Sequence, residues 1–343
     1  MGVQESKNGR AASGAAGVTR RALQGWWRKE DLRGQVALVT GGSRGLGLLL
    51  AREYAREGCT IAICARERDE LRRASADLER RGATVSAIVC DMTDPSQVKR
   101  LVEKVIGQYG RIDILANNAG IIQIGPALAM TRQDYEQAMN LMFWGVFNAT
   151  QAVLPHMLER KHGHVVNITS IGGKVSVPHL LPYCCAKFAA VGYSQGLHAE
   201  LARYGIKVTT IVPGLMRTGS FDQAQVKGNQ KGEFLWFGPS ASLPLLSMDA
   251  ERAARQIVQA TRRGDAERIL SWPAILLNGV HGLFPGATVS VLGLVNRFLP
   301  EADGANQHRA QGKDVRERTE GPLLKVLMRL GLSAARRFNE EDR

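Results

Sequence analysis

Short apolar runs alternate along the chain with longer segments in which apolar residues recur every three to four positions. The runs predict buried strands at 36–40, 60–64, 84–89, 112–116, 164–169, 207–212 and 268–272. The segments between them have helical periodicity, as in 67–81 and 96–109. This alternation predicts right-handed parallel crossovers, and hence an α/β fold with a doubly wound parallel sheet. Ligands of such sheets bind beyond the carboxyl ends of the strands, so the residues there carry the functional argument.

The first predicted strand runs directly into a glycine-rich turn, and an apolar helical stretch follows. This arrangement directs backbone N–H groups and a helix N-terminus at a pyrophosphate. The spacing is Gly-x-x-x-Gly-x-Gly, which differs from that of most dinucleotide folds, and a plain tight turn also requires glycine. We interpret the turn as a dinucleotide site with contacts from Gly41, Ser43, Arg44, Gly45, Leu46 and Gly47.

The next three strand ends supply candidates for the adenosine half of a dinucleotide. Arg66 ends the second strand, where an acidic residue would favour NAD, and Arg44 lies in the glycine turn. Two guanidinium groups favour the 2′-phosphate of NADP over NAD, although both could be ordinary surface arginines. Asp91 and Met92 follow the third strand, and Asp91 is placed to accept from the adenine amino group.

The fourth strand ends in amides and small residues, which let a cofactor approach the backbone. The contacts predicted there are Asn118, Ala119 and Gly120. An asparagine side chain can also join neighbouring strands, and for Asn117 and Asn118 this structural role is an equal alternative.

Tyr183 and Lys187 open a long predicted helix just after the strand whose end holds Ser170. Residues four apart share a helix face, so the ammonium lies beside the phenol. We expect the ammonium to lower the phenol pKa, giving an acid–base group for carbonyl/alcohol interconversion. Ser170 is placed to donate a hydrogen bond to the reacting oxygen. By itself, Tyr-x-x-x-Lys is usually a surface pair.

The sixth strand ends in Pro213 and Gly214, a rigid turn that places Thr218 to bond a carboxamide or phosphate. The following segment, 215–248, is rich in aromatic and aliphatic residues among glycines and prolines. We expect an irregular lid over the substrate.

Taken in order, these motifs resemble the short-chain dehydrogenase/reductase family, in its branch with a single Rossmann domain. The resemblance runs from about residue 34 to residue 272. It implies a catalytic tetrad in which Tyr183 exchanges the proton with the substrate oxygen and Ser170 polarises the carbonyl. Lys187 would hold the nicotinamide ribose, and Asn140 would hold a water of the proton relay. Hydride transfer itself would belong to the nicotinamide.

Two regions flank the predicted catalytic domain of residues 34–272. Residues 1–33 predict a basic arm with Trp26 and Trp27, and no apolar stretch follows Arg20-Arg21 as an export signal would require. The extension 273–343 begins with a weakly charged stretch to residue 300 that prolines and glycines interrupt, which argues against a simple transmembrane helix. Tails of related lipid and hydroxysteroid reductases help to bind membranes or form dimers.

The end of the extension combines an apolar stripe with basic residues. Leu323, Leu324, Val326, Leu327 and Leu330 lie opposite Lys325, Arg329, Arg336 and Arg337. The pattern fits an interfacial membrane helix and an ordinary docked helix equally.

Composition bears on two further classes of function, nucleic-acid binding and metal binding. The 343-residue chain carries a formal charge of +13, but its basic residues are interspersed with acidic ones, which argues against a nucleic-acid partner. Its five cysteines have no metal-ligand spacing, so we expect no metal site and a reducing, cytoplasmic setting.

The sequence therefore predicts an NADP-dependent oxidoreductase acting on a hydrophobic, lipid- or steroid-like ketone or aldehyde and its alcohol. We expect a homodimer or homotetramer. The alternative is a peripheral membrane or scaffold protein with a regulatory dinucleotide site.

Overall fold

The computed structural model describes residues 29–301, 307–319 and 321–340. Most of the predicted basic arm, including Trp26 and Trp27, lies outside the described residues. Among the residues described, no helix is both long enough and apolar enough to span a bilayer.

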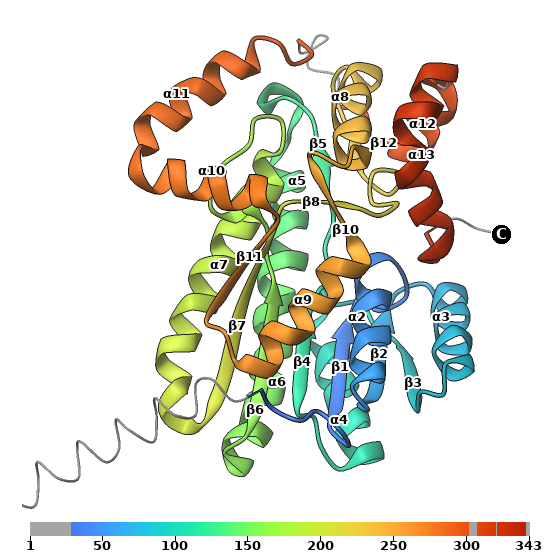
Figure 1. Cartoon of the computed structure of the whole chain (residues 1–343), viewed down its shortest axis with the longest axis vertical. Coiled ribbons are helices and arrows are strands. Elements are labelled where there is room, and N and C mark those ends of the chain that lie inside the picture. The colour runs from blue at the N-terminus through green and yellow to red at the C-terminus, as the bar shows by residue number, and fades with distance from the viewer. Residues whose placement is uncertain (1–28, 302–306, 320, 341–343) are drawn as a thin grey trace, which may run out of the picture.

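A parallel sheet of seven strands forms the centre of the described molecule (Figure 1). Its strands are β1 (Val36–Thr40), β2 (Thr60–Ala65), β3 (Val85–Val89), β4 (Ile114–Asn117), β6 (Gly163–Ile168), β7 (Ile206–Pro213) and β11 (Glu267–Leu270). Their order is β11-β7-β6-β4-β1-β2-β3. The chain reverses its direction of travel across the sheet between β1 and β4, so a crevice is expected at the carboxyl ends of these two strands. The predicted α/β class with a doubly wound parallel sheet is confirmed.

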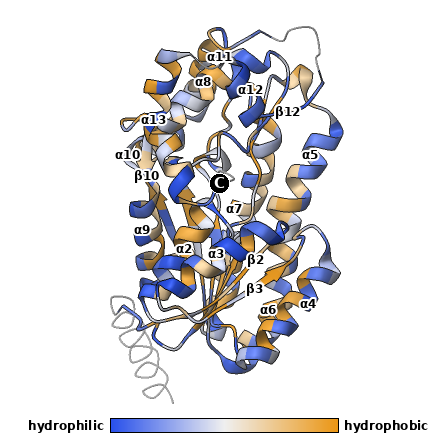
Figure 2. Ribbon diagram, turned by 90° about the vertical axis from the view of Figure 1, so that its right-hand side faces the viewer, coloured by the Kyte–Doolittle hydropathy of each residue, from blue (hydrophilic) through white to orange (hydrophobic). Residues whose placement is uncertain are grey.

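Helices cover both faces of the sheet because the side chains of each strand alternate between two apolar cores. Ala37 and Val39 pack with α2 (Gly45–Arg56), α3 (Arg68–Arg80) and α9 (Ala250–Arg263). Val36 and Leu38 pack with α4 (Pro95–Tyr109), α6 (Gly145–Arg160) and α7 (Leu181–Leu201). Figure 2 shows the apolar strands enclosed between helices whose outward faces are polar. Burial on both faces explains why the strands are continuous apolar runs.

A second group of elements lies beyond the carboxyl edge of the sheet (Figure 1). It contains a three-stranded sheet of β5 (Gln123–Ile124), β9 (Gln225–Val226) and β12 (Ala310–Gln311), and a parallel pair of β8 (Leu215–Arg217) and β10 (Ser247–Asp249). Its helices are α5 (Arg132–Met139), α8 (Gln230–Ser242), α12 (Gly312–Thr319) and α13 (Pro322–Arg337). The segment 215–248, expected to be irregular, is therefore largely regular, because the Phe234 and Phe237 side chains of α8 are buried in an apolar core.

Two consecutive helices, α10 (Trp272–Leu283) and α11 (Pro285–Asn296), project from the side of the molecule. We call residues 272–296 the apolar arm. The predicted last strand, 268–272, ends two residues early because Ser271 adopts a left-handed φ of 75° and Trp272 already begins α10.

Helix α13 docks against α8 rather than standing free. Leu324, Met328 and Gly331 are buried on its inner side, and the methyl group of Met328 approaches Gly238 of α8. The predicted apolar stripe divides, since Leu324 faces the core while Leu323 and Val326 are exposed. The docked alternative therefore describes this helix in the structure.

Candidate active site

The glycine-rich turn between β1 and α2 packs too closely for side chains at two positions. A Cβ on Gly47 would overlap the carbonyl oxygen of Gly41, and a Cβ on Gly41 would lie 3.0 Å from Cα of Ala119. Gly41 also has a φ of 63°, a conformation that favours glycine. The turn thus presents bare backbone at the start of α2, which suits an oxyanion ligand.

The amides at the end of β4 hold the neighbouring strands together. Asn117 Nδ2 donates to Asn167 Oδ1 at 2.9 Å, and Asn118 Nδ2 donates to the Thr40 carbonyl at 3.1 Å. Thr40 Oγ1 accepts from the backbone N–H groups of Asn118 and Ala119. The structural role predicted as an alternative is therefore present. Gly120 lies beside Met142, whose sulfur would be 3.5 Å from a Cβ there.

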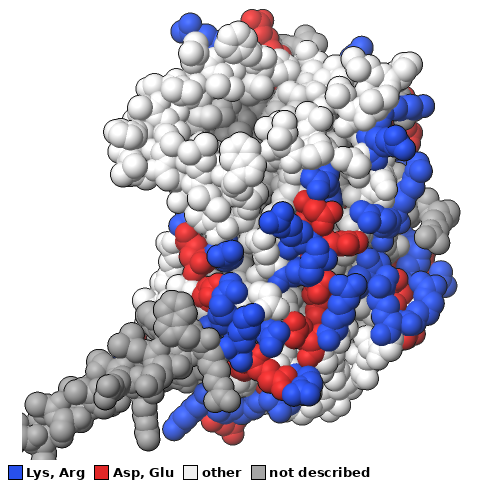
Figure 3. Space-filling model, in the orientation of Figure 1, with Lys and Arg blue, Asp and Glu red and all other residues white. Residues whose placement is uncertain are grey.

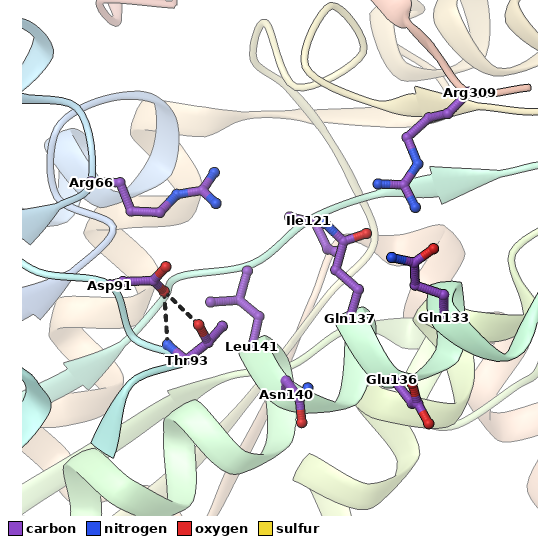
Figure 4. Close-up of a pocket in the computed structure, with 10 residues that line it drawn as sticks. All are labelled: Arg66, Asp91, Thr93, Ile121, Gln133, Glu136, Gln137, Asn140, Leu141 and Arg309. Atoms are coloured by element: carbon purple, nitrogen blue, oxygen red, sulfur yellow. Dashed lines mark hydrogen bonds between the residues drawn. The ribbon is translucent and has the colours of Figure 1, made fainter. Parts of the chain in front are cut away.

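A cavity of about 360 Å³ opens beyond the ends of β2 and β3 (Figure 4). Arg66 and Asp91 face it from one side and Arg309 from the other. Asp91 accepts hydrogen bonds from the N–H and hydroxyl of Thr93, at 2.9 and 2.8 Å. Met92, in contrast, is buried in the core under the sheet. Arg66 and Asp91 are thus brought together as predicted, and Met92 is turned away from the cavity.

The second arginine expected near the adenosine is held by an acidic residue. Arg44 Nη1 lies 2.6 Å from Glu70 Oε1, and Ser43 Oγ donates to Glu70 Oε2 at 2.8 Å. Glu70, on the first turn of α3, therefore engages two groups of the glycine loop. No sequence pattern pointed to Glu70, because the contact joins two residues that are 26 positions apart.

Ser170, Tyr183 and Lys187 meet at the carboxyl end of β6. Ser170 is close enough to the Tyr183 hydroxyl to act on its pKa, which it lowers. The buried Lys187 Nζ donates to the carbonyl of Ile168 at 2.9 Å and lies 5.8 Å from the centre of the Tyr183 ring. The first two turns of α7 position Tyr183 and Lys187, and β6 positions Ser170 two residues beyond its end.

The pKa of Tyr183 differs from the sequence expectation. Burial raises the pKa of Tyr183 to about 12, and the hydrogen bond from Ser170 offsets only part of that rise. Burial also lowers the pKa of Lys187 to about 8. The expected lowering of the phenol pKa is therefore not present in this structure, because desolvation outweighs the other influences and the Lys187 ammonium is directed at a backbone carbonyl.

The fourth residue of the predicted tetrad is Asn140. It is exposed and lines the cavity that contains Arg66, and in the described chain no hydrogen bond joins its side chain to Ser170, Tyr183 or Lys187. Met142, two residues later in a π-helical turn (Asn140–Trp144), is buried and packs against Tyr183 instead. A two-residue step rotates a side chain to the other side of a helix. The role of Asn140 in a proton relay stays a prediction.

The end of β7 and the turn after it contain the remaining predicted contacts, Pro213, Gly214 and Thr218. A Cβ on Gly214 would lie 2.7 Å from the Ser271 hydroxyl and 3.3 Å from the Cβ of Ala274, so the turn packs closely against the start of α10. Thr218 is buried, and its Oγ1 accepts from the Ser220 N–H at 3.2 Å. Pro213 is the last residue of β7.

An apolar cluster adjoins Tyr183. Its buried members include Leu180, Cys184, Phe221, Phe234, Phe237, Leu324 and Met328, and Tyr183 packs against it. The acidic Glu233 within α8 is bonded to His179 Nδ1 at 2.6 Å and to Trp236 Nε1 at 2.7 Å. Tyr183 is thus bordered by an apolar cluster.

The structure also places one residue in the glycine loop that sequence reasoning missed. Glu340, from the end of the chain, is buried beside Gly45 and accepts a hydrogen bond from the N–H of Gly219. The Gly45 N–H at the start of α2 is bonded to the same segment, through the Phe338 carbonyl at 2.9 Å. The local sequence marks a helix end at Asn339 but carries no signal of where the following residue docks.

Comparison with known proteins finds relatives in sequence and in fold. The family model described as short chain dehydrogenase matches residues 35–228. A putative ketoacyl reductase of Streptomyces coelicolor is 38% identical over 186 residues, covering 54% of this chain and 71% of that protein. A short-chain dehydrogenase structure from Streptomyces avermitilis superposes with a TM-score of 0.66 at 32% identity, covering 77% of this chain and 97% of the other. A gluconate 5-dehydrogenase from Burkholderia cenocepacia, in complex with NADP and tartrate, gives a TM-score of 0.63 at 27% identity, covering 72% and 98%.

Proposed function

The chain belongs to the short chain dehydrogenase family, an NAD(P)-dependent class of oxidoreductases, and from this premise we propose that it reduces a hydrophobic ketone or aldehyde with NADPH. The observation that carries the proposal is the meeting of Ser170, Tyr183 and Lys187 beside the apolar cluster of Phe221, Phe234 and Phe237. A lipid- or steroid-like substrate matches such a wall, because apolar contact area supplies most of the binding free energy.

The residues present fit a dinucleotide. The glycine loop would hold the pyrophosphate, while Arg66 and Asp91 would hold the adenosine half in the cavity of Figure 4. Lys187 would hold the nicotinamide ribose, with Pro213, Gly214 and Thr218 forming the wall on the nicotinamide side. The bound nicotinamide supplies the hydride that reduces the carbonyl carbon.

The protein's own part is to place the carbonyl and to supply the proton. In the direction of reduction, the Tyr183 hydroxyl donates its proton to the carbonyl oxygen as that carbon gains the hydride, and the product is the alcohol. A raised pKa keeps the Tyr183 phenol protonated at neutral pH, as a proton donor requires. Ser170 orients the substrate oxygen by hydrogen bonding, and segment 215–248 would act as the lid over the substrate.

The preference for NADP over NAD rests on Arg66 and Arg44. Arg66 faces the cavity of Figure 4, and Arg44 lies in the glycine loop, where it pairs with Glu70. A 2′-phosphate would compete with Glu70 for Arg44, so Glu70 moderates the preference that the two arginines create.

Tyr183→Phe tests the proposal. We expect turnover of lipid and steroid ketones to fall by roughly 100- to 10,000-fold, because the variant has no proton to donate. The measurement is NADPH oxidation against a panel of ketones, with NADPH affinity measured separately as the control. Equal turnover by the two proteins would remove Tyr183 from the mechanism.

A homodimer or homotetramer is also proposed, on the basis of an exposed aromatic group on α6 and α7 and the turn before them. Phe143 and Trp144 stack edge-to-face at 4.8 Å, Phe147 and Tyr193 lie 5.6 Å apart, and Trp144 and Phe188 are exposed. Large exposed aromatic residues are enriched at interfaces between subunits.

A second candidate function, peripheral attachment to a membrane, is favoured by the apolar arm. Residues 272–296 contain no Asp, Glu, Lys or Arg, and Ile275, Leu283 and Phe284 are exposed. Figure 3 shows this projection without charge, whereas charged side chains crowd the neighbouring surface. Each helix of the arm has 12 residues, about 18 Å, which suits lying in a lipid surface rather than crossing it.

A further inference from the structure

The last described residues turn back from α13 into the glycine loop. Helix α13 is followed by Asn339 in the left-handed conformation, at a φ of 61°. The N–H of Phe338 bonds to the Ala334 carbonyl, and the N–H of Glu340 bonds to the Ala335 carbonyl. This is the hydrogen-bond pattern of a helix C-terminus that reverses the chain. Both Figure 1 and Figure 2 show this end of the chain above α2 and α3.

Three consecutive residues then contact the loop. The Phe338 carbonyl accepts from the N–H of Gly45 at 2.9 Å, at the start of α2. Asn339 Nδ2 donates to the carbonyls of Ser43 and Glu70, at 2.8 and 3.1 Å. Glu340 Oε2 accepts from the Gly219 N–H at 2.5 Å.

The Glu340 carboxylate lies where an oxyanion ligand of the loop belongs. Its other oxygen is 2.9 Å from the position of a Cβ on Gly45, and only 9% of the residue is exposed. It therefore fills the gap between the N-terminus of α2 and the turn that contains Gly219. A pyrophosphate held by the N–H groups of α2 needs the same space, so the two cannot occupy it together.

We propose that residues 338–340, the C-terminal latch, form an internal competitor that must leave the glycine loop before a dinucleotide binds. The proposal rests on the proposed function and adds the regulation of the same site. Linkage then requires the converse, that dinucleotide binding displaces the latch.

The close packing of Gly219 against the latch supports a specific contact. A Cβ on Gly219 would lie 2.6 Å from the Cβ of Ala335 and 2.9 Å from the Cβ of Glu340. The latch fits only because the facing residue is glycine. The Phe338 side chain is buried in the main core beside Ala334 and anchors the latch, whereas the Phe338 carbonyl and residues 339 and 340 are the groups that must leave the loop.

The test compares the full-length protein with Glu340→Ala, which removes the carboxylate and leaves the Phe338 base in place. Glu317→Ala, an exposed glutamate on α12, is the matched control. The probes are NADPH, which contains a pyrophosphate, and adenosine 2′-monophosphate, which does not, each titrated calorimetrically. Removal of one buried hydrogen bond corresponds to about a tenfold change in an equilibrium.

We expect Glu340→Ala to bind NADPH about tenfold more tightly than the wild type, with adenosine 2′-monophosphate affinity unchanged. Equal NADPH affinity in the two proteins overturns the latch and leaves the proposed function standing. Failure of both proteins to bind NADPH overturns the proposed function and the latch with it. Thermal unfolding of each variant checks that the fold is retained.

Hydrogen exchange gives an independent readout. NADPH should slow exchange in residues 41–47 and speed it in residues 335–340, because the ligand replaces the latch. Slower exchange in both segments would contradict the proposal. Glu317→Ala should follow the wild type in both measurements.

Discussion

At the scale of single residues, burial sets the pKa values of the two groups that we propose as the acid–base pair. Tyr183 has a pKa of about 12, so it remains protonated throughout the physiological range. Lys187 has a pKa of about 8, lowered by burial from its usual value. The group whose charge changes under ordinary conditions is therefore the lysine, and the tyrosine remains an acid.

A pH profile tests this assignment. The ammonium form of Lys187 is present below its pKa of about 8 and is lost as pH rises through that value. Because kcat/KM for NADPH reports the free enzyme, we expect it to decline above about pH 8. A profile that stays level to about pH 10, the ordinary range of a lysine, would show that the charge of Lys187 is not needed for cofactor capture.

Glu70 is the residue whose removal should change the choice of cofactor. Glu70→Gln releases Arg44 and Ser43 and removes a negative charge near the proposed 2′-phosphate. We expect the ratio of kcat/KM for NADPH to that for NADH to rise about tenfold, which corresponds to one charge-assisted contact.

The matched control is Asp69→Asn, one residue earlier on the same helix, where the carboxylate is exposed and pairs with Arg72. Its cofactor ratio should stay at the wild-type value. If Glu70→Gln leaves the ratio unchanged as well, the 2′-phosphate does not use Arg44.

At the scale of elements, α10 and α11 differ from the other helices in having apolar side chains exposed on much of their surface. Trp272, Leu276 and Leu294 are more than half exposed, at 63%, 59% and 53%. A helix that is apolar all round is ordinarily buried. A covering surface, either lipid or a second protein copy, is therefore expected for the arm.

Flotation with phosphatidylcholine vesicles tests the lipid alternative. We expect the full-length protein to float and the double variant Leu283→Ser/Phe284→Ser to remain in the dense fraction, because these side chains are exposed at the junction of the two helices. Val326→Ser on α13 is the control for loss of an exposed apolar side chain elsewhere. Failure of the full-length protein to float, together with a smaller oligomer for the double variant, would identify the covering surface as a second copy.

At the scale of the whole molecule, the last described residues contact the glycine loop, which lies near the start of the described chain. Burial raises the pKa of Glu340 to about 7, whereas the Gly219 N–H and Arg44 act to lower it. Asp222 and Glu70 add to the rise, and Asp222 is itself paired with Arg316. Because the docked carboxyl has the higher pKa, protonation favours docking.

The latch should therefore weaken as pH rises from about 4.5, the ordinary glutamate value, to about 7. We expect NADPH affinity of the wild type to increase over this range and to level off above it. Glu340→Ala should lack this increase in affinity. Both proteins should keep the decline in kcat/KM for NADPH above about pH 8 that is assigned to Lys187. If NADPH affinity of Glu340→Ala rises over the same pH range, a group other than Glu340 causes the increase.

Much of the core and part of the site were predictable because their signals are local. Continuous apolar runs identify strands buried on both faces, and β1 was predicted at its observed bounds. The glycine turn and the Tyr183–Lys187 spacing depend only on neighbours in sequence, so the structure places them as expected.

The sequence by itself determined the layered α/β core, the position of the glycine loop between β1 and α2, and the placement of Tyr183 and Lys187 one turn apart on α7, since periodicity and short spacings specify these features. Only the tertiary structure decided that Met142 packs in a cluster with Tyr183, that Glu70 holds Arg44, and that Glu340 lies beside Gly45 of the glycine loop. The physical reason is distance along the chain. These contacts, and the desolvation that sets the pKa values of Tyr183 and Lys187, depend on which surfaces the folded molecule brings together.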